Sequence, residues 1–409
     1  MMLLYMDFPL VFTPIEDAPQ ASLGLSASSL EPLYAAIQGH IEEGRYPGCQ
    51  LALAWQGRLL VDRSFGMARL GKRESLEPNA QPVSPDPNLD DQAVVARPDH
   101  LWLLYSNTKV LIAAALWKLA ENGQLRFGDP VSAYLPSFSR HGKGGITLYH
   151  LITHQAGFPH AEVPASMWHD MSQVAEFYAD VVPEWVAGSR VHYHGLSAHW
   201  VLALVMEAVT GQRFQDAVRR LVLEPLGLAQ DLLMGISGSA KERMSFLYEP
   251  DPERPGSLRL RSESSSETWQ RSAVPGGGAY GTARGMAALY QMMLMGGRLN
   301  GVQWISPRTL AYAIRNHTGD RVDQFMGIPM HRGLGPHMRG HSLSIRGLGD
   351  IAPADTFGHG GVGTSYCWGD PQSGLSMAYI TNARIPEPWH SWRLNQISNL
   401  VHAAIRPLG

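Results

Sequence analysis

Residues 101–121 read Leu101-Trp-Leu-Leu-Tyr-Ser-Asn-Thr-Lys-Val-Leu-Ile-Ala-Ala-Ala-Leu-Trp-Lys-Leu-Ala-Glu121. An apolar segment runs up to Ser106, and the residues from Asn107 onward are strong helix formers that stop at Asn122-Gly123, a pair suited to a helix C-cap. Ser106 is therefore predicted to lie at the N-terminus of a helix. Positions three apart share one helix face, so the Lys109 ammonium group can reach the Ser106 hydroxyl.

This Ser-x-x-Lys spacing suits nucleophilic catalysis. A serine hydroxyl is a weak nucleophile until its proton is removed, and a lysine in an apolar pocket has a lowered pKa that lets it help. A helix N-terminus adds free N–H groups where an oxyanion would develop. The spacing alone is weak, because it arises by chance about once in a chain of this length. Its plain alternative is a helix-capping Ser106 and a solvated Lys109.

The two ends of the chain predict an antiparallel sheet flanked by helices. Near the N-terminus, a helix over residues 28–45 precedes strands over 49–55 and 58–65, which are joined by a tight turn at Gln56-Gly57. Near the C-terminus, strands around Phe357 and over 377–381 precede a helix over 392–405.

The middle of the chain is mostly helical in pattern, for example over residues 198–210 before Gly211. We therefore expect an α+β fold in which a mainly helical domain, 119–270, is inserted into a discontinuous sheet domain, 28–118 plus 271–409. Residues 1–27 are expected to form an N-terminal extension. Residues 71–98 are rich in Pro, Asn and Asp and predict a long surface excursion, which we expect to cover the mouth of the cleft.

Composition excludes several classes of function. The 409 residues carry a formal net charge of −3 and no concentrated Lys/Arg face, so a nucleic-acid partner is not expected. No stretch reaches the roughly 18 apolar residues of a membrane span, and the start of the chain lacks a basic signal-peptide region. A cytoplasmic protein is expected, with the oligomeric state left open. Cys49 and Cys367 are expected to be buried free thiols.

Two further motifs accompany the Ser-x-x-Lys spacing. Tyr193-His-Gly195 lies just before a predicted helix, and His359-Gly-Gly361 lies in the glycine-rich segment that starts at Phe357. Ser-x-x-Lys with two such later motifs is the pattern of penicillin-binding proteins and serine β-lactamases. The chain resembles the class C β-lactamase-like branch of that family and its family VIII carboxylesterases. Four further blocks support the resemblance, in the family's order: residues 125–136, 146–157, 224–228 and 276–282.

The resemblance implies a role for each motif. Ser106 would be the acylated nucleophile, Lys109 its proton partner, and Tyr193 the phenol that passes a proton to the leaving group. The backbone N–H groups of Ser106 and Val362 would form the oxyanion hole, with Val362 following His359-Gly360-Gly361 on an edge strand. A free phenol is a poor base at neutral pH, so the role of Tyr193 depends on a nearby Lys109.

Two departures from the family pattern point toward esters. β-Lactamases and D,D-peptidases of this branch usually carry Asn two residues after the tyrosine, where it bonds the substrate amide, but this chain has Gly195. The Lys of the third motif is replaced by His359, which supplies no fixed cation for a β-lactam carboxylate near neutral pH.

Other residues near the motifs are candidates for substrate binding, with core packing as the alternative for each. The expected substrate-binding set is His359, Gly360, Gly361, Gly195, Tyr105 and Trp368, and the tryptophans near the motifs, Trp102, Trp185, Trp200 and Trp368, suggest an apolar acyl or alcohol pocket. No metal site is expected, because the histidines near Tyr193 and the pair His150/His154 lack carboxylate or Cys ligands at a matching spacing.

The leading hypothesis is a serine carboxylesterase that needs no cofactor and acts on a small-molecule ester through an acyl-enzyme on Ser106. An acyltransferase, a D-amino-acid amidase or peptidase, or a weak β-lactamase could use the same residues. A catalytically silent scaffold of the same fold is the non-enzymatic alternative.

Overall fold

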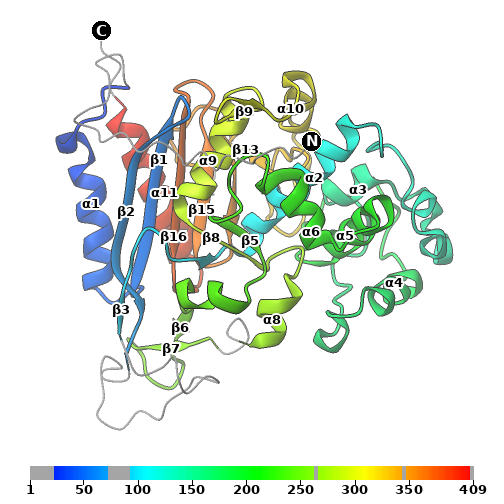
Figure 1. Cartoon of the computed structure of the whole chain (residues 1–409), viewed down its shortest axis with the longest axis horizontal. Helices are drawn as coiled ribbons and strands as arrows, with labels where there is room; N and C mark the ends of the chain where they lie inside the picture. Colours follow the sequence, from blue (N-terminus) through cyan, green and yellow to red (C-terminus); the bar gives the residue numbers. More distant parts are fainter. Residues whose placement is uncertain (1–22, 72–92, 262–265, 343–346, 406–409) are drawn as a thin grey trace, which may run out of the picture.

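The computed structural model describes residues 23–71, 93–261, 266–342 and 347–405 (Figure 1). Its main sheet has seven strands in the order β13-β14-β15-β16-β1-β2-β3, and all neighbouring strands are antiparallel. The strands are β1 (Gly48–Trp55), β2 (Arg58–Arg69), β3 (Val94–Val95), β13 (His337–Met338), β14 (Phe357–Gly361), β15 (Ser365–Gly369) and β16 (Leu375–Thr381). Strand β1 pairs with β16, so both ends of the chain build one sheet, as predicted.

The turn between β1 and β2 explains why these residues form a hairpin. Gln56 and Gly57 both have positive φ, 49° and 73°, which is the backbone of a type I′ turn. That turn matches the twist of the flanking strands and fixes their register, in which Trp55 faces Arg58. The predicted hairpin is confirmed, and β2 continues four residues further than expected, to Arg69.

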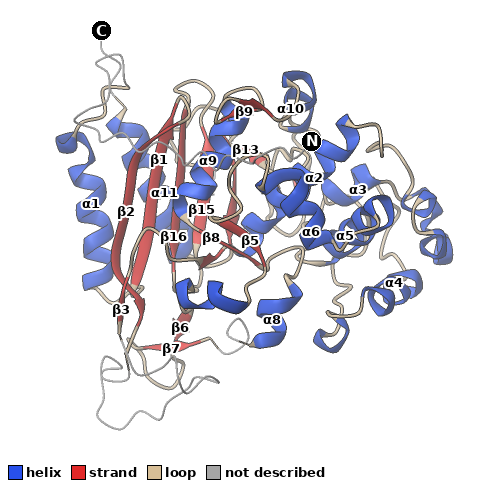
Figure 2. Ribbon diagram, viewed as in Figure 1, coloured by secondary structure: helices blue, strands red, loops and turns tan. Residues whose placement is uncertain are grey.

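Helices cover both faces of the main sheet (Figure 2). Helices α1 (Ala27–Glu42) and α11 (Trp389–Ala404) pack together on one face, and α9 (Ala283–Leu294) packs on the other, against β1, β15 and β16. A capping box at Ser26 starts α1, because the Ser26 and Ser29 side chains each bond the other residue's backbone N–H. The two terminal helices expected from the sequence are thus present.

The remaining helices gather beside the face that α9 covers (Figure 1). They are α2 (Thr108–Glu121), α3 (Leu148–Ile152), α4 (Met171–Asp180), α5 (Ser197–Thr210), α6 (Phe214–Val218), α8 (Glu267–Ser272) and α10 (Pro307–Ala313). Helix α5 ends where Gly211 adopts a left-handed conformation, as predicted.

Short strands interrupt this helical part. A three-stranded sheet joins β4 (Trp102–Leu103), β8 (Ala279–Gly281) and β5 (Leu232–Met234), and β6 (Tyr248–Pro250) pairs with β7 (Leu258–Leu260). Three of these strands lie within 119–270, and the division into two domains at these limits stays a prediction. Residues 1–22 and 72–92, which make up most of the expected extension and excursion, lie outside the described residues.

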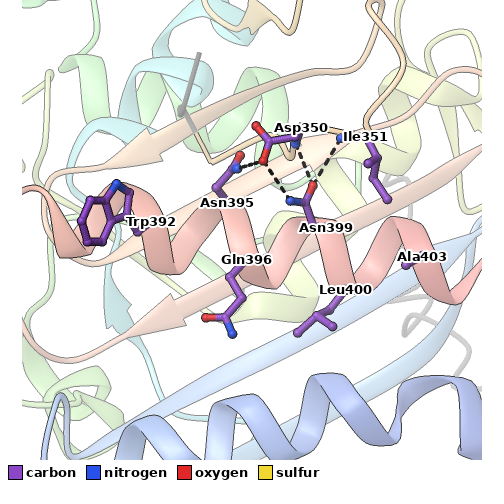
Figure 3. Close-up of a pocket in the computed structure, with 8 residues that line it drawn as sticks. All are labelled: Asp350, Ile351, Trp392, Asn395, Gln396, Asn399, Leu400 and Ala403. Carbon is purple, nitrogen blue, oxygen red and sulfur yellow. Dashed lines mark hydrogen bonds between the residues drawn. The ribbon is translucent and has the colours of Figure 1, made fainter. Parts of the chain in front are cut away.

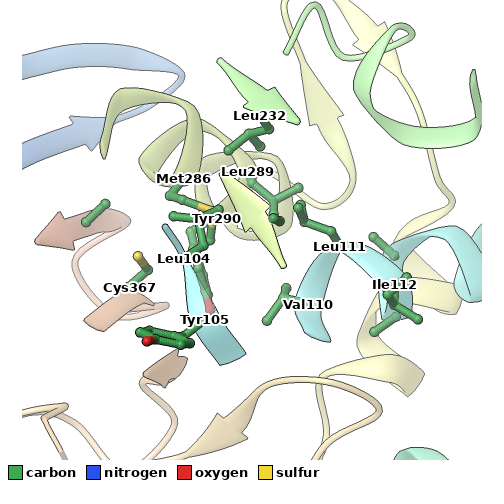
Figure 4. Close-up of a cluster of buried hydrophobic side chains, with 14 of the residues drawn as sticks. Leu104, Tyr105, Val110, Leu111, Ile112, Leu232, Met286, Leu289, Tyr290 and Cys367 are labelled. Atoms are coloured by element: carbon green, nitrogen blue, oxygen red, sulfur yellow. The ribbon is translucent and has the colours of Figure 1, made fainter. Parts of the chain in front are cut away.

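One hydrophobic core holds the start of α2 in place (Figure 4). Side chains from α2, β5, α9 and β15 converge there on the segment before Ser106, and nearly all of α2 is buried. A helix buried on all sides cannot rotate or shift without loss of packing. The labelled members are Leu104, Tyr105, Val110, Leu111, Ile112, Leu232, Met286, Leu289, Tyr290 and Cys367. Both cysteines are buried and free, as expected.

Candidate active site

Ser106 lies in a single 3-10 turn, Tyr105–Asn107, that leads directly into α2. Tyr105 has a φ of 44°, a left-handed backbone conformation that is uncommon for a bulky residue and is often found at functional sites. Hydrogen bonds on both sides fix the turn: the Asn107 amide donates to Ser365 Oγ at 3.0 Å, and the Thr108 hydroxyl accepts from Ala279 N–H at 3.0 Å. Ser106 is thereby held between the main sheet and the small one.

Two side chains converge on the Ser106 hydroxyl. Lys109 Nζ lies 3.1 Å from Ser106 Oγ, and the Tyr193 hydroxyl lies 2.8 Å from the same oxygen. The structure therefore brings the three expected catalytic residues within hydrogen-bonding distance, although they are up to 87 positions apart in sequence. Their roles in a reaction stay a prediction.

Lys109 is 1% exposed and sits in an unusual environment for an ammonium group. Its Nζ donates a second hydrogen bond, 2.6 Å long, to the carbonyl oxygen of Gly276. Burial lowers the pKa of Lys109, and the nearby Arg332 lowers it further, while Tyr193 acts in the opposite direction. When its pKa is lowered, a larger fraction of a lysine is unprotonated near neutral pH and available to accept a proton than for a solvated lysine.

Residues that the sequence analysis missed hold Tyr193 in position. The backbone N–H of Tyr193 donates to Asp323 Oδ1 at 3.2 Å, and Asp323 Oδ2 in turn accepts from Arg332 Nε at 3.0 Å. Burial by itself raises the pKa of Asp323, but Arg332 and the backbone donors hold it below its usual value. The His154 ring lies 4.7 Å from the Tyr193 ring between centroids. No sequence signal marked Arg332 or Asp323, whereas His154 lies in the recurring block 146–157.

The third motif passes directly beside Ser106. A Cβ atom on Gly361 would lie 2.6 Å from the Leu104 carbonyl oxygen, so the backbone of β14 approaches this closely only because the residue is glycine. His359, on the same strand, is buried, and its ring lies 6.4 Å from that of Tyr193. Burial, with a contribution from Lys109, lowers the pKa of His359 to about 3. His359 is therefore neutral at pH 7.

The expected place of Val362 needs a correction. Strand β14 is not the edge of the sheet, because the two-residue strand β13 pairs with Phe357 and Gly358. Such a short strand is hard to predict from sequence. Val362 lies in the turn after β14, beyond the reach of β13, and is 48% exposed. On one side, Gly360 and Gly361 pair with β15. On the other side, which faces the Ser106 turn, β13 ends before it reaches these two glycines.

Two other expected binding residues lie in contrasting places. Gly195 is exposed, and a Cβ atom there would meet nothing within 4 Å, so this position has room for a side chain. Trp368 is fully buried on the opposite face of β15: its Nε1 donates to Ser398 of α11, and its ring stacks on His402 at 4.4 Å. The prediction that Trp368 binds substrate is wrong, because adjacent strand residues point to opposite faces, and Ser365 and Cys367 lie on the face toward the Ser106 turn.

The remaining aromatic candidates divide between core and site. Trp102 and Trp200 are fully buried and follow the core alternative, whereas Tyr105 packs against Trp269 at 6.2 Å beside the Ser106 turn.

A shallow hollow along α11 lies on the far face of the sheet and belongs to no part of this site (Figure 3). Across the described ranges, no group of three or more His, Cys, Asp or Glu side chains is arranged to hold a metal ion. None of the helices in the described part of the chain is both long and apolar enough to cross a lipid bilayer.

The chain is similar to several known proteins. The family model described as "Beta-lactamase" matches residues 33–397. The Mycobacterium tuberculosis protein "Esterase/beta-lactamase LipL" is 24% identical over 306 residues, which cover 68% of this chain and 68% of that protein. Further curated relatives, among them one from Escherichia coli K12 at 24% identity over 90% of this chain, bear the name "Putative D-alanyl-D-alanine carboxypeptidase".

Solved structures share the fold. A penicillin-binding-protein homologue from Caulobacter crescentus aligns with a TM-score of 0.76 at 24% identity, covering 93% of this chain and 98% of that one. A family VIII carboxylesterase aligns with a TM-score of 0.74 at 24% identity, covering 91% and 98%. The α+β fold expected from the sequence is thus the β-lactamase/transpeptidase-like fold. With a family match that spans nearly the whole chain, this protein belongs to the beta-lactamase family.

Proposed function

We propose that the protein is a serine carboxylesterase that hydrolyses small-molecule esters through an acyl-enzyme on Ser106. The observation that carries the proposal is the position of Ser106 Oγ, within 3.1 Å of Lys109 Nζ and 2.8 Å of the Tyr193 hydroxyl. These distances allow a proton to leave Ser106 as its oxygen attacks a carbonyl carbon. A silent scaffold would have no need to keep three such groups in contact.

The proposed reaction has two steps. In the first, Ser106 Oγ gives its proton to Lys109 and bonds to the ester carbonyl carbon, the C–O bond to the alcohol breaks, and a proton passes from Lys109 through Tyr193 to the departing alkoxide. In the second, the oxygen of a water molecule bonds to the acyl carbon, the bond from that carbon to Ser106 Oγ breaks, and the water proton passes along the same route to Ser106 Oγ as the carboxylic acid leaves. The N–H groups of Ser106 and Val362 are proposed to stabilise the oxyanion in both steps.

Two features favour esters over β-lactams and peptides as substrates. His359 occupies the position of the family's lysine and is neutral at pH 7, since burial holds its pKa at about 3, so it offers no charge to a substrate carboxylate. Gly195 has no side chain to bond a substrate amide, and a Cβ atom added there would meet nothing within 4 Å. An ester needs neither contact.

The test is a steady-state assay of the purified protein on a short-chain p-nitrophenyl ester and on a chromogenic cephalosporin, with Ser106→Ala as control. The proposal expects ester turnover that the substitution abolishes and little cephalosporin turnover. Dominant cephalosporin turnover would show a β-lactamase. Ester consumption that yields a new ester when an alcohol acceptor is added, and little free acid, would show an acyltransferase instead.

A further inference from the structure

A chain of aromatic rings leads from Tyr193 to the protein surface. Phe325 lies 5.8 Å from Tyr193 and 5.9 Å from His192 between ring centroids. His192 in turn lies 5.6 Å from Trp185 and 5.4 Å from His160. We call the four residues Phe325, His192, Trp185 and His160 the aromatic strip. They come from segments far apart in sequence, so the fold assembles the strip.

The strip occupies the solvent side of Tyr193. Five groups surround the Tyr193 ring, and four of them are buried: Lys109, His154, Arg332 and His359. The fifth, Phe325, is 63% exposed. It lies in the turn between β11 (Val322–Asp323) and β12 (Ile328–Pro329), whose Asp323 also holds the Tyr193 backbone. Of these five groups, Phe325 is therefore the one that reaches the protein surface.

Ring edges of the strip are fixed by polar partners. His192 Nδ1 lies 3.2 Å from the Tyr193 carbonyl oxygen, and His160 Nδ1 lies 3.0 Å from the Glu184 carboxylate. The Arg190 guanidinium lies 5.5 Å from the Trp185 ring. A single exposed apolar side chain is ordinary, but a continuous set of oriented rings beside a catalytic centre is typical of a ligand-binding surface.

The chemistry of the reaction decides which part of the substrate would lie on the strip. The leaving oxygen of the ester has to come within hydrogen-bonding distance of the Tyr193 hydroxyl to receive its proton. The group attached to that oxygen then lies beside Tyr193, on its open side, where Phe325 begins the strip. Flat rings stack favourably on aromatic side chains, whereas short alkyl groups gain little there.

We propose that the aromatic strip binds the alcohol portion of the substrate and that this portion carries an aromatic ring, as in a phenyl ester. The inference rests on the proposed function, because it assumes that Tyr193 protonates the group leaving from Ser106. In that step the bond between the acyl carbon and the aryl oxygen breaks, the acyl carbon stays on Ser106 Oγ, and the aryl oxygen leaves as a phenol with the proton from Ser106.

The first measurement compares phenyl acetate with ethyl acetate. Both esters give the same acetyl-enzyme, so deacylation is common to them and only the alcohol portion differs. For Phe325→Ala we expect the ratio of kcat/KM for phenyl acetate to kcat/KM for ethyl acetate to fall about fivefold. Phe325→Leu, which keeps the apolar bulk without the ring, is expected to lose most of the same selectivity. Equal losses for the two esters would overturn the proposal.

A matched control is Ile351→Ala. Ile351 is similarly exposed, at 59%, but lines the hollow along α11 on the far face of the sheet (Figure 3). This substitution is expected to leave kcat/KM for both esters unchanged. Thermal denaturation of each variant checks that the fold is intact, and because Phe325 is exposed its replacement is expected to leave Tm unchanged.

A second measurement separates this inference from the proposed function. Binding of phenol and of phenyl acetate to Ser106→Ala, followed by saturation-transfer NMR, needs no turnover. We expect binding that Phe325→Ala in the same background weakens. If the native enzyme hydrolyses no ester but this binding occurs, the proposed function fails and the aromatic strip stands as a binding site. Ester turnover with no Phe325-dependent binding overturns the strip alone.

Discussion

The Arg332 guanidinium lies 5.0 Å from the centroid of the Tyr193 ring. It also pairs with the Asp323 carboxylate, which accepts a hydrogen bond from the backbone N–H of Tyr193. Both members of the pair, Arg332 and Asp323, are buried. Arg332 thus supports Tyr193 twice, through its position over the ring and through Asp323. A cation over an aromatic face is attractive, and a buried ion pair is costly to break on one side.

Removing only the arginine is therefore expected to harm the fold and the site together. Arg332→Met leaves the Asp323 carboxylate buried without its cation, which should lower the free energy of unfolding by about 3–5 kcal/mol. Urea unfolding measures this loss. Arg332→Lys, which keeps the charge but not the paired N–H geometry, is expected to recover part of it. A loss for Arg332→Met below about 1 kcal/mol, the scale of an exposed pair, would contradict a structural role for the pair.

Lys109 is expected to matter for catalysis and not for folding. Lys109→Met keeps the length of the side chain and removes a charge from a fully buried place, so Tm should stay the same or rise. Loss of the proton partner should lower kcat on the order of 10²- to 10⁴-fold. Initial rates and thermal denaturation of one preparation check both parts. A variant that retains nearly full activity would assign the proton transfer to Tyr193 alone.

The pH dependence of ester hydrolysis should follow from the lowered pKa of Lys109. The lysine must be deprotonated to accept the serine proton, so kcat/KM should rise with pH. Its midpoint should lie below the value of about 10.4 that a solvated lysine shows. His359 should cause no further rise or fall of kcat/KM near neutral pH, because its pKa is about 3. The profile of Lys109→Met, measured on its residual activity, should lack the rising limb. A midpoint at or above that of free lysine would contradict the assignment.

The sequence predicted the parts of this site that depend on local order. The helix that begins after Ser106, the hairpin at Gln56-Gly57 and the end of α5 at Gly211 follow from propensities and turn residues within a few positions of each feature. The ring of groups around Tyr193 could not be predicted that way. Asp323 reaches Tyr193 only because the short hairpin of β11 and β12 forms a bridge to Val191, two residues before Tyr193, and Arg332 follows that hairpin and pairs with Asp323.

The error at Trp368 has a physical cause. All five residues of β15 are buried, because α9 covers one face of the sheet and α11 the other. A strand buried on both faces loses the alternation of polar and apolar residues from which orientation is inferred. The sequence could therefore place Trp368 next to the third motif in the chain but not on the correct side of the sheet.

Stability in acid is expected to fall because of the buried histidines. His359 and His194 are fully buried, and burial lowers the pKa of each to about 3. Below about pH 6.5 the unfolded chain takes up protons on these residues while the native state does not, so stability present above that pH is lost progressively down to about pH 3. His359→Gln removes one of these proton-binding groups. The slope of the unfolding free energy against pH should therefore fall by up to about 1.4 kcal/mol per pH unit, the value for a difference of one bound proton. An unchanged slope would mean that His359 is protonated in the folded protein.

The open space at Gly195 gives a direct test of substrate discrimination. A Cβ atom there meets nothing within 4 Å, and the φ of Gly195 is not positive, so Gly195→Asn should fold normally and place an amide beside Tyr193. A hydrogen bond from that amide to a substrate acylamide is worth about 1 kcal/mol net, which corresponds to about a fivefold gain in kcat/KM for a chromogenic cephalosporin. Gly195→Ala is the matched control, because it adds the same Cβ atom without the amide. Ester hydrolysis should change equally little in both variants, since a simple ester has no acylamide to bond. If Gly195→Ala raises cephalosporin turnover as much as Gly195→Asn does, the gain comes from a stiffer backbone and not from the added amide, and the ester preference has to be attributed to His359 instead.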